Sequence, residues 1–242
     1  MGRERESLFG KKKAGRKKRS EEIREERETQ WLIICEGKKT EPNYFRGFLN
    51  DLKARGIADL DVRIEGTGLN TVGLVNRAEN YFDIVDKICG KVRVPYLDEK
   101  IIFVFDRDGF SEKNFNDAVK IAEGRYPGCT VAWSNESFEL WLCLHFDYID
   151  TPQHRDWYND RLTDIFREKG VFTKKQSYDS DGKNDEELFE KIMLCGGDLN
   201  KAIKRADKLI DGKRLNNPAK CNPATMIFRA INVLMKEANQ KS

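Results

Sequence analysis

The chain has 242 residues, of which 35% are charged and 39% are hydrophobic, and its formal net charge is +3 at pH 7. This length suits one domain with appendages. The mean hydropathy is −0.70, and no apolar run reaches the roughly 18 residues that a membrane-spanning helix needs. The charged N-terminus also lacks the apolar segment of a signal peptide. We therefore expect a cytoplasmic protein without a membrane segment.

The positive charge is concentrated at the N-terminus. Residues 1–30 contain eleven Lys/Arg and seven Glu and almost no apolar side chains, so they predict a flexible tail. Such a tail could contact phosphates nonspecifically or could simply be solvated.

The cysteines do not indicate a metal or disulfide site. None of them forms a CxxC pair, so we expect reduced, structural thiols. They are Cys35, Cys89, Cys129, Cys143, Cys195 and Cys221.

The first half of the chain alternates between strand and helix patterns. Residues 31–35 form a short apolar run that predicts a buried strand, and 40–55 follow with helical spacing and Thr40 as the expected N-cap. Residues 61–65 alternate like a strand, and 71–88 predict a second helix.

The alternation continues with the most apolar strand of the chain. Residues 100–105 predict a strand, 113–126 a helix and 129–133 another strand. This order predicts an α/β fold with a mostly parallel sheet of about four strands, covered by helices on both faces.

The second half is mainly helical. We therefore divide the chain into a tail at 1–30, a core at 31–146 and a helical C-terminal extension at 147–242 that packs on the core. The last helix should begin with Asn222 as its cap and Pro223 in its first turn. The predicted helices are 140–146, 157–169, 186–195, 199–210 and 223–238.

Three acidic residues follow two of the predicted strands. Glu36 follows the first strand, and Asp106 and Asp108 follow the third, two residues apart and thus on one side of an extended segment. Strands of a parallel sheet bring such residues to the same edge, where Mg²⁺ could join the carboxylates. An Asp-x-Asp pair alone can also be a turn or a helix cap.

Four segments together resemble the RloB family over roughly residues 31–235. They are residues 35–45 (CEGKKTEPNYF), 103–109 (FVFDRDG), 134–146 (SNESFELWLCLHF) and 222–225 (NPAT). The resemblance implies a toprim-type core, and it implies abortive-infection defence against phage beside an AAA-type ATPase. It also implies that Glu36, Asp106 and Asp108 are metal ligands and that Asn222 faces the site.

Other residues near these motifs are candidates with a simpler alternative. Glu139 is a further ligand, a partner for a basic group or a helix-surface acid. Lys38 and Lys39 precede a helix N-terminus and could hold phosphate, as could Arg107 between the two aspartates. His145 is either a proton shuttle or a hydrogen-bonded core histidine.

Three aromatic side chains could stack on bases, but aromatics in apolar runs usually belong to a core. They are Trp133, Phe138 and Trp141.

These observations favour a nuclease dependent on Mg²⁺ or Mn²⁺ that hydrolyses phosphodiesters as the effector of an antiphage system. RNA, tRNA in particular, is expected before DNA by analogy. No GxxxxGK[ST] motif occurs, so an ATPase would be a partner. The alternative is a nonenzymatic subunit that binds nucleic acid or the ATPase. The oligomeric state is open, with a homodimer among the options.

Overall fold

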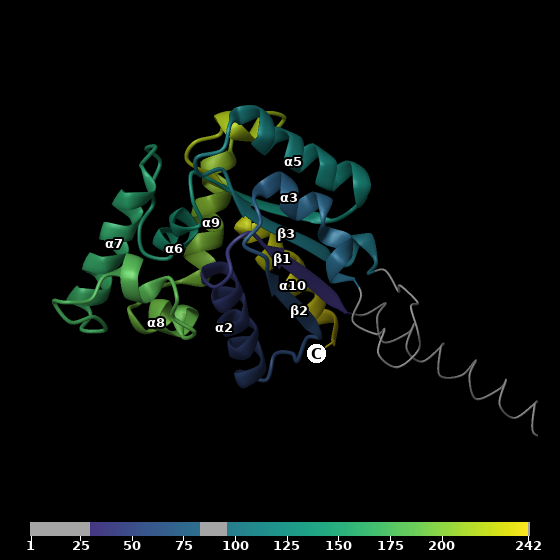
Figure 1. Ribbon diagram of the computed structural model, residues 1–242. Coiled ribbons are helices and arrows are strands. Elements are labelled where there is room, and N and C mark those ends of the chain that lie inside the picture. The colour runs from purple at the N-terminus through teal and green to yellow at the C-terminus, as the bar shows by residue number, and fades with distance from the viewer. Residues whose placement is uncertain (1–29, 83–95, 242) are drawn as a thin grey trace, which may run out of the picture.

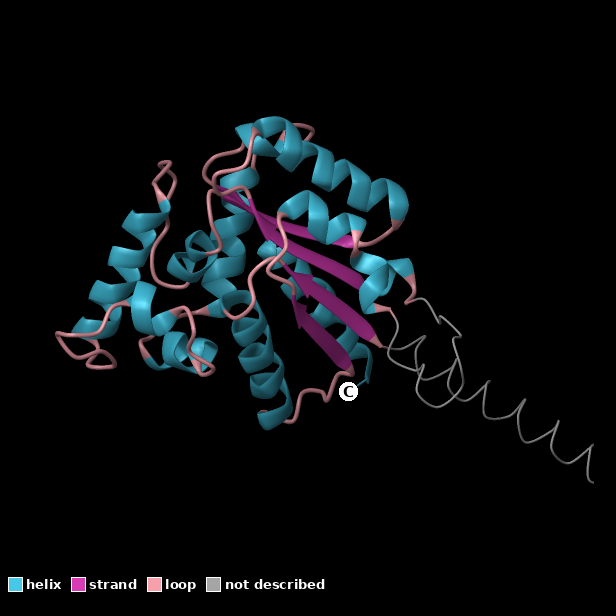
Figure 2. Ribbon diagram, viewed as in Figure 1, coloured by secondary structure: helices cyan, strands magenta, loops and turns pink. Residues whose placement is uncertain are grey.

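The computed structural model describes residues 30–82 and 96–241, so the predicted tail lies outside the described residues except for Gln30. An α/β fold surrounds a five-stranded sheet in the order β2-β1-β3-β4-β5 (Figure 1, Figure 2). The first four strands pair in parallel, and β5 is antiparallel to β4. The strands are β1 (Trp31–Cys35), β2 (Val62–Gly66), β3 (Ile101–Asp106), β4 (Thr130–Asn135) and β5 (Ala224–Thr225).

The expected mostly parallel sheet is confirmed, with a short fifth strand in addition to the four predicted. Every residue of β1 and β3 is buried, as expected for central strands covered on both faces. Their pairing in register brings the end of β1 beside Val104 and the end of β3 beside Ser134. The C-terminal ends of β1, β3 and β4 therefore meet at one edge.

Helices cover both faces of the sheet (Figure 1). On one face, Phe115 of α5 packs edge-on against Phe105 of β3, with ring centroids 5.7 Å apart, and α3 lies against α5. On the other face, Lys100 forms an ion pair of 2.6 Å with Glu237 of α10. The helices are α2 (Thr40–Ala54), α3 (Thr71–Asn76), α5 (Glu112–Arg125), α6 (Glu139–Leu144), α7 (Arg155–Glu168), α8 (Leu188–Leu194), α9 (Leu199–Ile210) and α10 (Ile227–Lys241).

The predicted helix at 71–88 is shorter in the structure. It ends at Asn76, a 3₁₀ turn follows at Ala78–Tyr81, and residues 83–88 lie outside the described part. The ring of Phe82 packs against Tyr96 and Tyr126, at centroid distances of 5.9 Å each. The apolar spacing predicted that the helix continues through Phe82. Tertiary packing of this kind can override such a local helical preference.

The predicted start of the last helix at Pro223 is wrong. The Asn222-Pro223 peptide is cis, β5 follows it, and α10 begins only at Ile227. Pairing with β4 accounts for the difference, because Thr225 lies opposite Ser134 and their hydroxyl groups lie 3.0 Å apart. Asn222 is therefore not a helix cap, and the C-terminal segment contributes a strand to the sheet.

The predicted N-cap of the first helix is wrong by one residue. Thr40 is the first residue of α2, and Lys39 is its N-cap. The Thr40 hydroxyl donates instead to the carbonyl oxygen of Lys183 at 3.0 Å.

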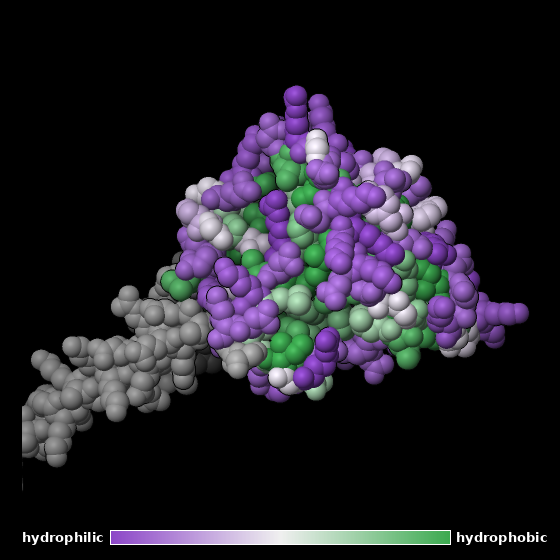
Figure 3. All heavy atoms as spheres, turned by 180° about the vertical axis from the view of Figure 1, so that it is seen from behind, coloured by the Kyte–Doolittle hydropathy of each residue, from purple (hydrophilic) through white to green (hydrophobic). Residues whose placement is uncertain are grey.

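Across 30–82 and 96–241, no helix has the length and apolarity to cross a membrane. The face shown in Figure 3 is mostly hydrophilic, with small separate hydrophobic patches.

Truncation of a buried side chain in α10 should destabilise the whole fold. Leu234 is fully buried, so Leu234→Ala should lower the free energy of unfolding by about 2–5 kcal/mol through lost burial and a cavity. Leu194→Ala is the matched control, because Leu194 is 77% exposed and its loss should cost less than about 0.5 kcal/mol. Urea denaturation measures both. Equal effects of the two variants would contradict the packing of α10 described above.

Candidate active site

Carboxylates gather where the parallel strands end. Glu36 directly follows β1, Asp106 is the last residue of β3, and Glu139 begins α6 shortly after β4. Such an edge is the usual place for a binding site in a parallel α/β sheet. The structure thus brings two of the three predicted metal ligands to one edge, together with Glu139.

Glu36 bonds to the strand beside it. Its Oε2 accepts hydrogen bonds of 3.3 Å from the backbone N–H of Asp106 and from the hydroxyl of Thr71. Burial raises the pKa of Glu36 from its ordinary value of 4.5 to about 7, and the negative charge of Glu41 adds to the rise. The hydrogen bonds oppose this shift but do not cancel it. Glu36 can therefore exchange a proton near neutral pH.

Asp106 is buried, and only one of its two carboxylate oxygens has a hydrogen-bond partner in the described residues. Its Oδ2 accepts a hydrogen bond of 2.9 Å from the backbone N–H of Phe138, whereas Oδ1 is buried and has no hydrogen-bond partner among the described residues. Burial raises the pKa of Asp106 well above its ordinary value, and the charges of Glu41 and Glu139 raise it further. A neutral carboxyl or a bound cation would relieve this repulsion.

Glu41 is an additional member of the cluster that the sequence interpretation missed. Its side chain is 6% exposed, and its Oε1 accepts a hydrogen bond of 3.3 Å from the backbone N–H of Gly37. Burial raises the pKa of Glu41 to about 7. A methyl group at Gly37 would lie 2.0 Å from Glu41 Oε2, so any side chain there would displace the Glu41 carboxylate. The only sequence signal was its place five residues after Glu36, which also fits an ordinary first-turn acid.

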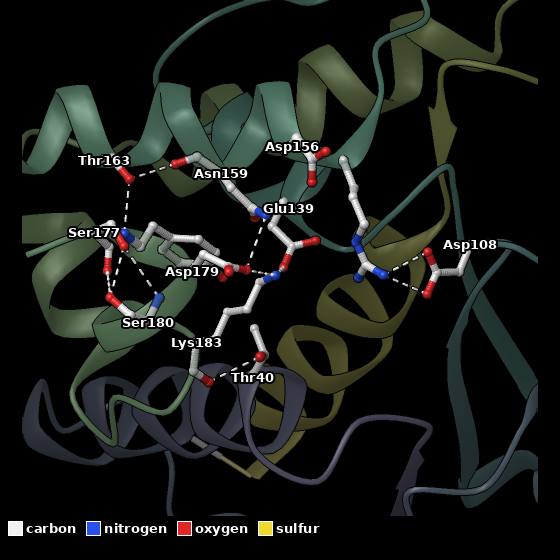
Figure 4. A network of polar contacts seen from close by, with 12 residues as sticks. Thr40, Asp108, Glu139, Asp156, Asn159, Thr163, Ser177, Asp179, Ser180 and Lys183 are labelled. Carbon is white, nitrogen blue, oxygen red and sulfur yellow. Dashed lines mark hydrogen bonds and ion pairs between the residues drawn. The ribbon is translucent and has the colours of Figure 1, made fainter.

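Glu139 lies between the sheet edge and the helical extension (Figure 4). It is 3% exposed, its Oε1 lies 3.9 Å from Lys183 Nζ, and its Oε2 is buried without a partner among the residues described. Lys183 also forms an ion pair of 2.5 Å with Asp179. Glu139 is therefore a buried acid that faces a basic group, and the helix-surface alternative is wrong.

Asp108 differs from the expectation of an extended Asp-x-Asp pair. Its φ of 43° is left-handed, because β3 ends at Asp106 and the chain turns. The Asp108 carboxylate accepts two hydrogen bonds from Nη1 of Arg155, at 2.7 and 2.6 Å (Figure 4). The two aspartates therefore do not share one side of a strand, and Asp108 is paired with a cation that the sequence interpretation did not identify.

The donor set fits a hard cation. Mg²⁺ prefers oxygen ligands, and Oδ1 of Asp106 and Oε2 of Glu139 are two buried carboxylate oxygens without a hydrogen-bond partner in the described chain. Within 30–82 and 96–241, no three His, Cys, Asp or Glu side chains are already close enough together to hold a metal ion. Side-chain adjustment would be needed for Glu36 and Asp106 to share a cation with a third acid.

His145 lies in the core. It is 1% exposed, its Nε2 lies 3.0 Å from the hydroxyl of Tyr44, and its ring packs edge-on against Trp141. Burial lowers the pKa of His145 to about 3, so the ring is neutral at physiological pH. A proton shuttle needs contact with substrate or solvent, so we replace that hypothesis with a structural role.

The basic candidates lie around the loops of this edge. Lys38 and Lys39 are exposed beside Glu36, and the stem of Lys38 covers Gly68. Arg107 is half-buried, and its Nε is buried with no partner in the part of the chain described. Asn222 likewise has a buried Oδ1 without a partner there. Within the described residues, no hydrogen bond or ion pair joins any of these four side chains to a carboxylate of the site.

The aromatic and thiol side chains belong to the core, as the simpler alternatives predicted. Trp133, Phe138 and Trp141 are each at most 3% exposed, which leaves no face free to stack on a base. The cysteines in the described residues are free, and Cys89 lies outside them.

Comparison with known proteins gives one match. The family model of RloB-like proteins matches residues 31–234, from β1 into α10. No curated protein and no solved structure matches the chain.

The buried acids should make the metal-free protein less stable as the pH rises from about 5 to about 7.5. Glu36 and Glu41 have folded-state pKa values of about 7, above their ordinary 4.5, so within this window the unfolded chain releases protons that the folded chain keeps. The free energy of unfolding should therefore fall through the window and then level off. Glu41 alone should contribute on the order of 1–3 kcal/mol.

Urea denaturation in EDTA at pH 5 and pH 7.5 measures this fall. Glu41→Gln should reduce it, because the amide cannot ionise, whereas Glu123→Gln on the exposed surface of α5 should leave it unchanged. A fall of the same size in both variants would show that Glu41 does not carry the effect.

Proposed function

The chain belongs to the RloB-like protein family, and from its acidic site we propose that it is a phosphodiesterase that cleaves nucleic acid with Mg²⁺ or Mn²⁺. The proposal includes a toprim-type core. Its support is the order of the acids, since Glu36 follows β1 and Asp106 ends β3, which are neighbouring parallel strands. This is the order in which the resemblance implies the ligands.

One observation carries the proposal. Asp106 and Glu139 each bury a carboxylate oxygen that has no hydrogen-bond partner in the described residues, beside Glu36 and Glu41. A protein that only needed a stable fold would gain nothing from this arrangement, because a buried polar group without a partner costs about 1–3 kcal/mol. Carboxylate oxygens without partners suit a divalent cation that also binds substrate phosphate, with the side-chain adjustment described above.

Glu36, Asp106 and Asp108 would hold the metal, with Glu139 as a further ligand. When bound, the metal supplies Lewis-acid activation of water and stabilises the charge on the leaving oxygen. The Phe138 N–H holds Oδ2 of Asp106, and Oδ1 stays without a hydrogen-bond partner in the described residues. Glu36 is either a ligand or the group that accepts the proton of the attacking water.

The substrate and setting follow from family analogy. We propose RNA, with tRNA first and DNA second, and a role as the toxic effector of an antiphage abortive-infection system with an AAA-type ATPase as partner. Lys38 and Lys39 are exposed and lie with Glu36 in the loop between β1 and α2. This position supports a role for both lysines in binding substrate phosphate. Cytoplasmic location is part of the proposal, and the oligomeric state is left open, with a homodimer among the options.

Removal of one buried carboxylate charge should abolish cleavage. Asp106→Asn keeps the size of the side chain but removes its charge, so metal-dependent cleavage should fall by more than about 100-fold, since even outer-shell partners of metal ligands are worth about 10–100-fold. The assay is incubation of the purified chain with tRNA, other RNA or plasmid DNA, in Mg²⁺, Mn²⁺ or EDTA.

Asp117→Asn is the matched control, because Asp117 lies on α5 and pairs with Lys113 on the surface. It should cleave like the wild type. Inactivity of the wild-type chain on every substrate, also with a candidate ATPase added, would favour the alternative of a nonenzymatic binding subunit.

A further inference from the structure

Arg155 places a positive charge at the acidic site. It is the first residue of α7, and its side chain is 32% exposed, so it lies at the rim of the site and not in the core. Its Nη1 donates to both oxygens of Asp108, at 2.7 and 2.6 Å. The acids Glu139 and Asp106 are also close enough to interact with its charge.

The contacts of Arg155 leave one edge of the guanidinium group unused. An arginine has five N–H donors, and its Nε and Nη2 together can donate two parallel hydrogen bonds to a carboxylate or a phosphate. Both bonds to Asp108 come from Nη1, and Nε is buried without a partner among the described residues. The edge that recognises an anion by two parallel bonds is therefore not occupied by Asp108.

Two other arginines of the same helix show the contrast. Arg161 directs both Nε and Nη2 at one oxygen of Asp147, and Arg167 directs both at the carbonyl oxygen of Gln176. These arginines use that edge for contacts within the protein. Arg155 is held by its far nitrogen instead, and a donor that could complete a second contact is left buried and unpartnered.

We propose that Arg155 is a phosphate-binding residue of this site, which takes a phosphodiester oxygen pair with its Nε–Nη2 edge while Asp108 positions its Nη1. The inference rests on the proposed function, because the phosphate is that of the nucleic-acid substrate. Asp108 then has two tasks, since a ligating carboxylate is commonly also hydrogen-bonded by an outer partner. Once a cation has neutralised the buried acids, Arg155 remains beside them as a positive charge that can meet an anion.

The test measures binding of a fluorescein-labelled single-stranded RNA of defined sequence to the full chain by fluorescence anisotropy. Ca²⁺ replaces Mg²⁺, and a gel verifies that the RNA stays intact. Arg155→Gln should weaken binding by about tenfold to a hundredfold, as expected for the loss of charge-assisted hydrogen bonds. Arg155→Lys, which keeps the charge but not the two parallel donors, should bind with intermediate affinity.

Arg161→Gln is the matched control, because it removes an arginine of the same helix that pairs with Asp147 on the surface. Its affinity should equal that of the wild type. The inference is overturned if Arg155→Gln binds as tightly as the wild type, or if Arg155→Gln and Arg161→Gln weaken binding equally. If Arg155→Gln does not fold, Arg155→Lys decides, and wild-type affinity in that variant overturns the inference.

Failure of the proposed function looks different. In that case the wild-type chain neither binds nor cleaves RNA or DNA with any divalent cation, whatever residue stands at position 155. A wild-type chain that binds and cleaves while Arg155→Gln is unchanged refutes only the role of Arg155.

Discussion

Buried negative charge at one edge of the sheet is the constraint on which the site depends. Parallel pairing of β1, β3 and β4 ends these strands side by side, so the acids that follow them share one poorly solvated volume. Loss of water raises the pKa values of Asp106 and Glu41 there, and the negative charge of Glu139 raises both further. Burial of uncompensated charge is expensive, so the surrounding chain must supply protons, hydrogen bonds or cations.

The helical extension supplies the cations. Arg155 of α7 reaches Asp108, and Lys183 lies between Glu139 and Asp179, so acidic and basic side chains alternate from the end of β3 to the turn after α7 (Figure 4). These contacts join the extension to the core. The compensation is incomplete, because the closest cation to Glu139 in the described chain is 3.9 Å from one of its oxygens and the other oxygen has no partner.

The sequence predicts those parts of the site that local patterns encode. A buried central strand is an apolar run, so the acids that end such runs, Glu36 and Asp106, could be identified directly. Glu41 could not, because a glutamate in a first helical turn has an ordinary explanation and only the fold turns it inward. Arg155 lies 47 residues after Asp108, and no local pattern connects them. Likewise β5 has only two residues, too short for a sequence pattern, and it is defined by its pairing with β4.

Because the charge of the buried acids is only partly neutralised by nearby cations, a catalytic role is favoured over a scaffold role. A binding subunit could replace the inward acids with amides or apolar side chains and become more stable, because buried charges contribute little or negatively to stability. In this chain the buried groups that have no hydrogen-bond partner are of opposite kinds. Asp106 and Glu139 each have a buried carboxylate oxygen without a hydrogen-bond partner in the described residues, whereas Arg155 has a buried N–H donor without one. Under the proposed function, a divalent cation with a phosphodiester would satisfy both at once, and neither group alone would do so.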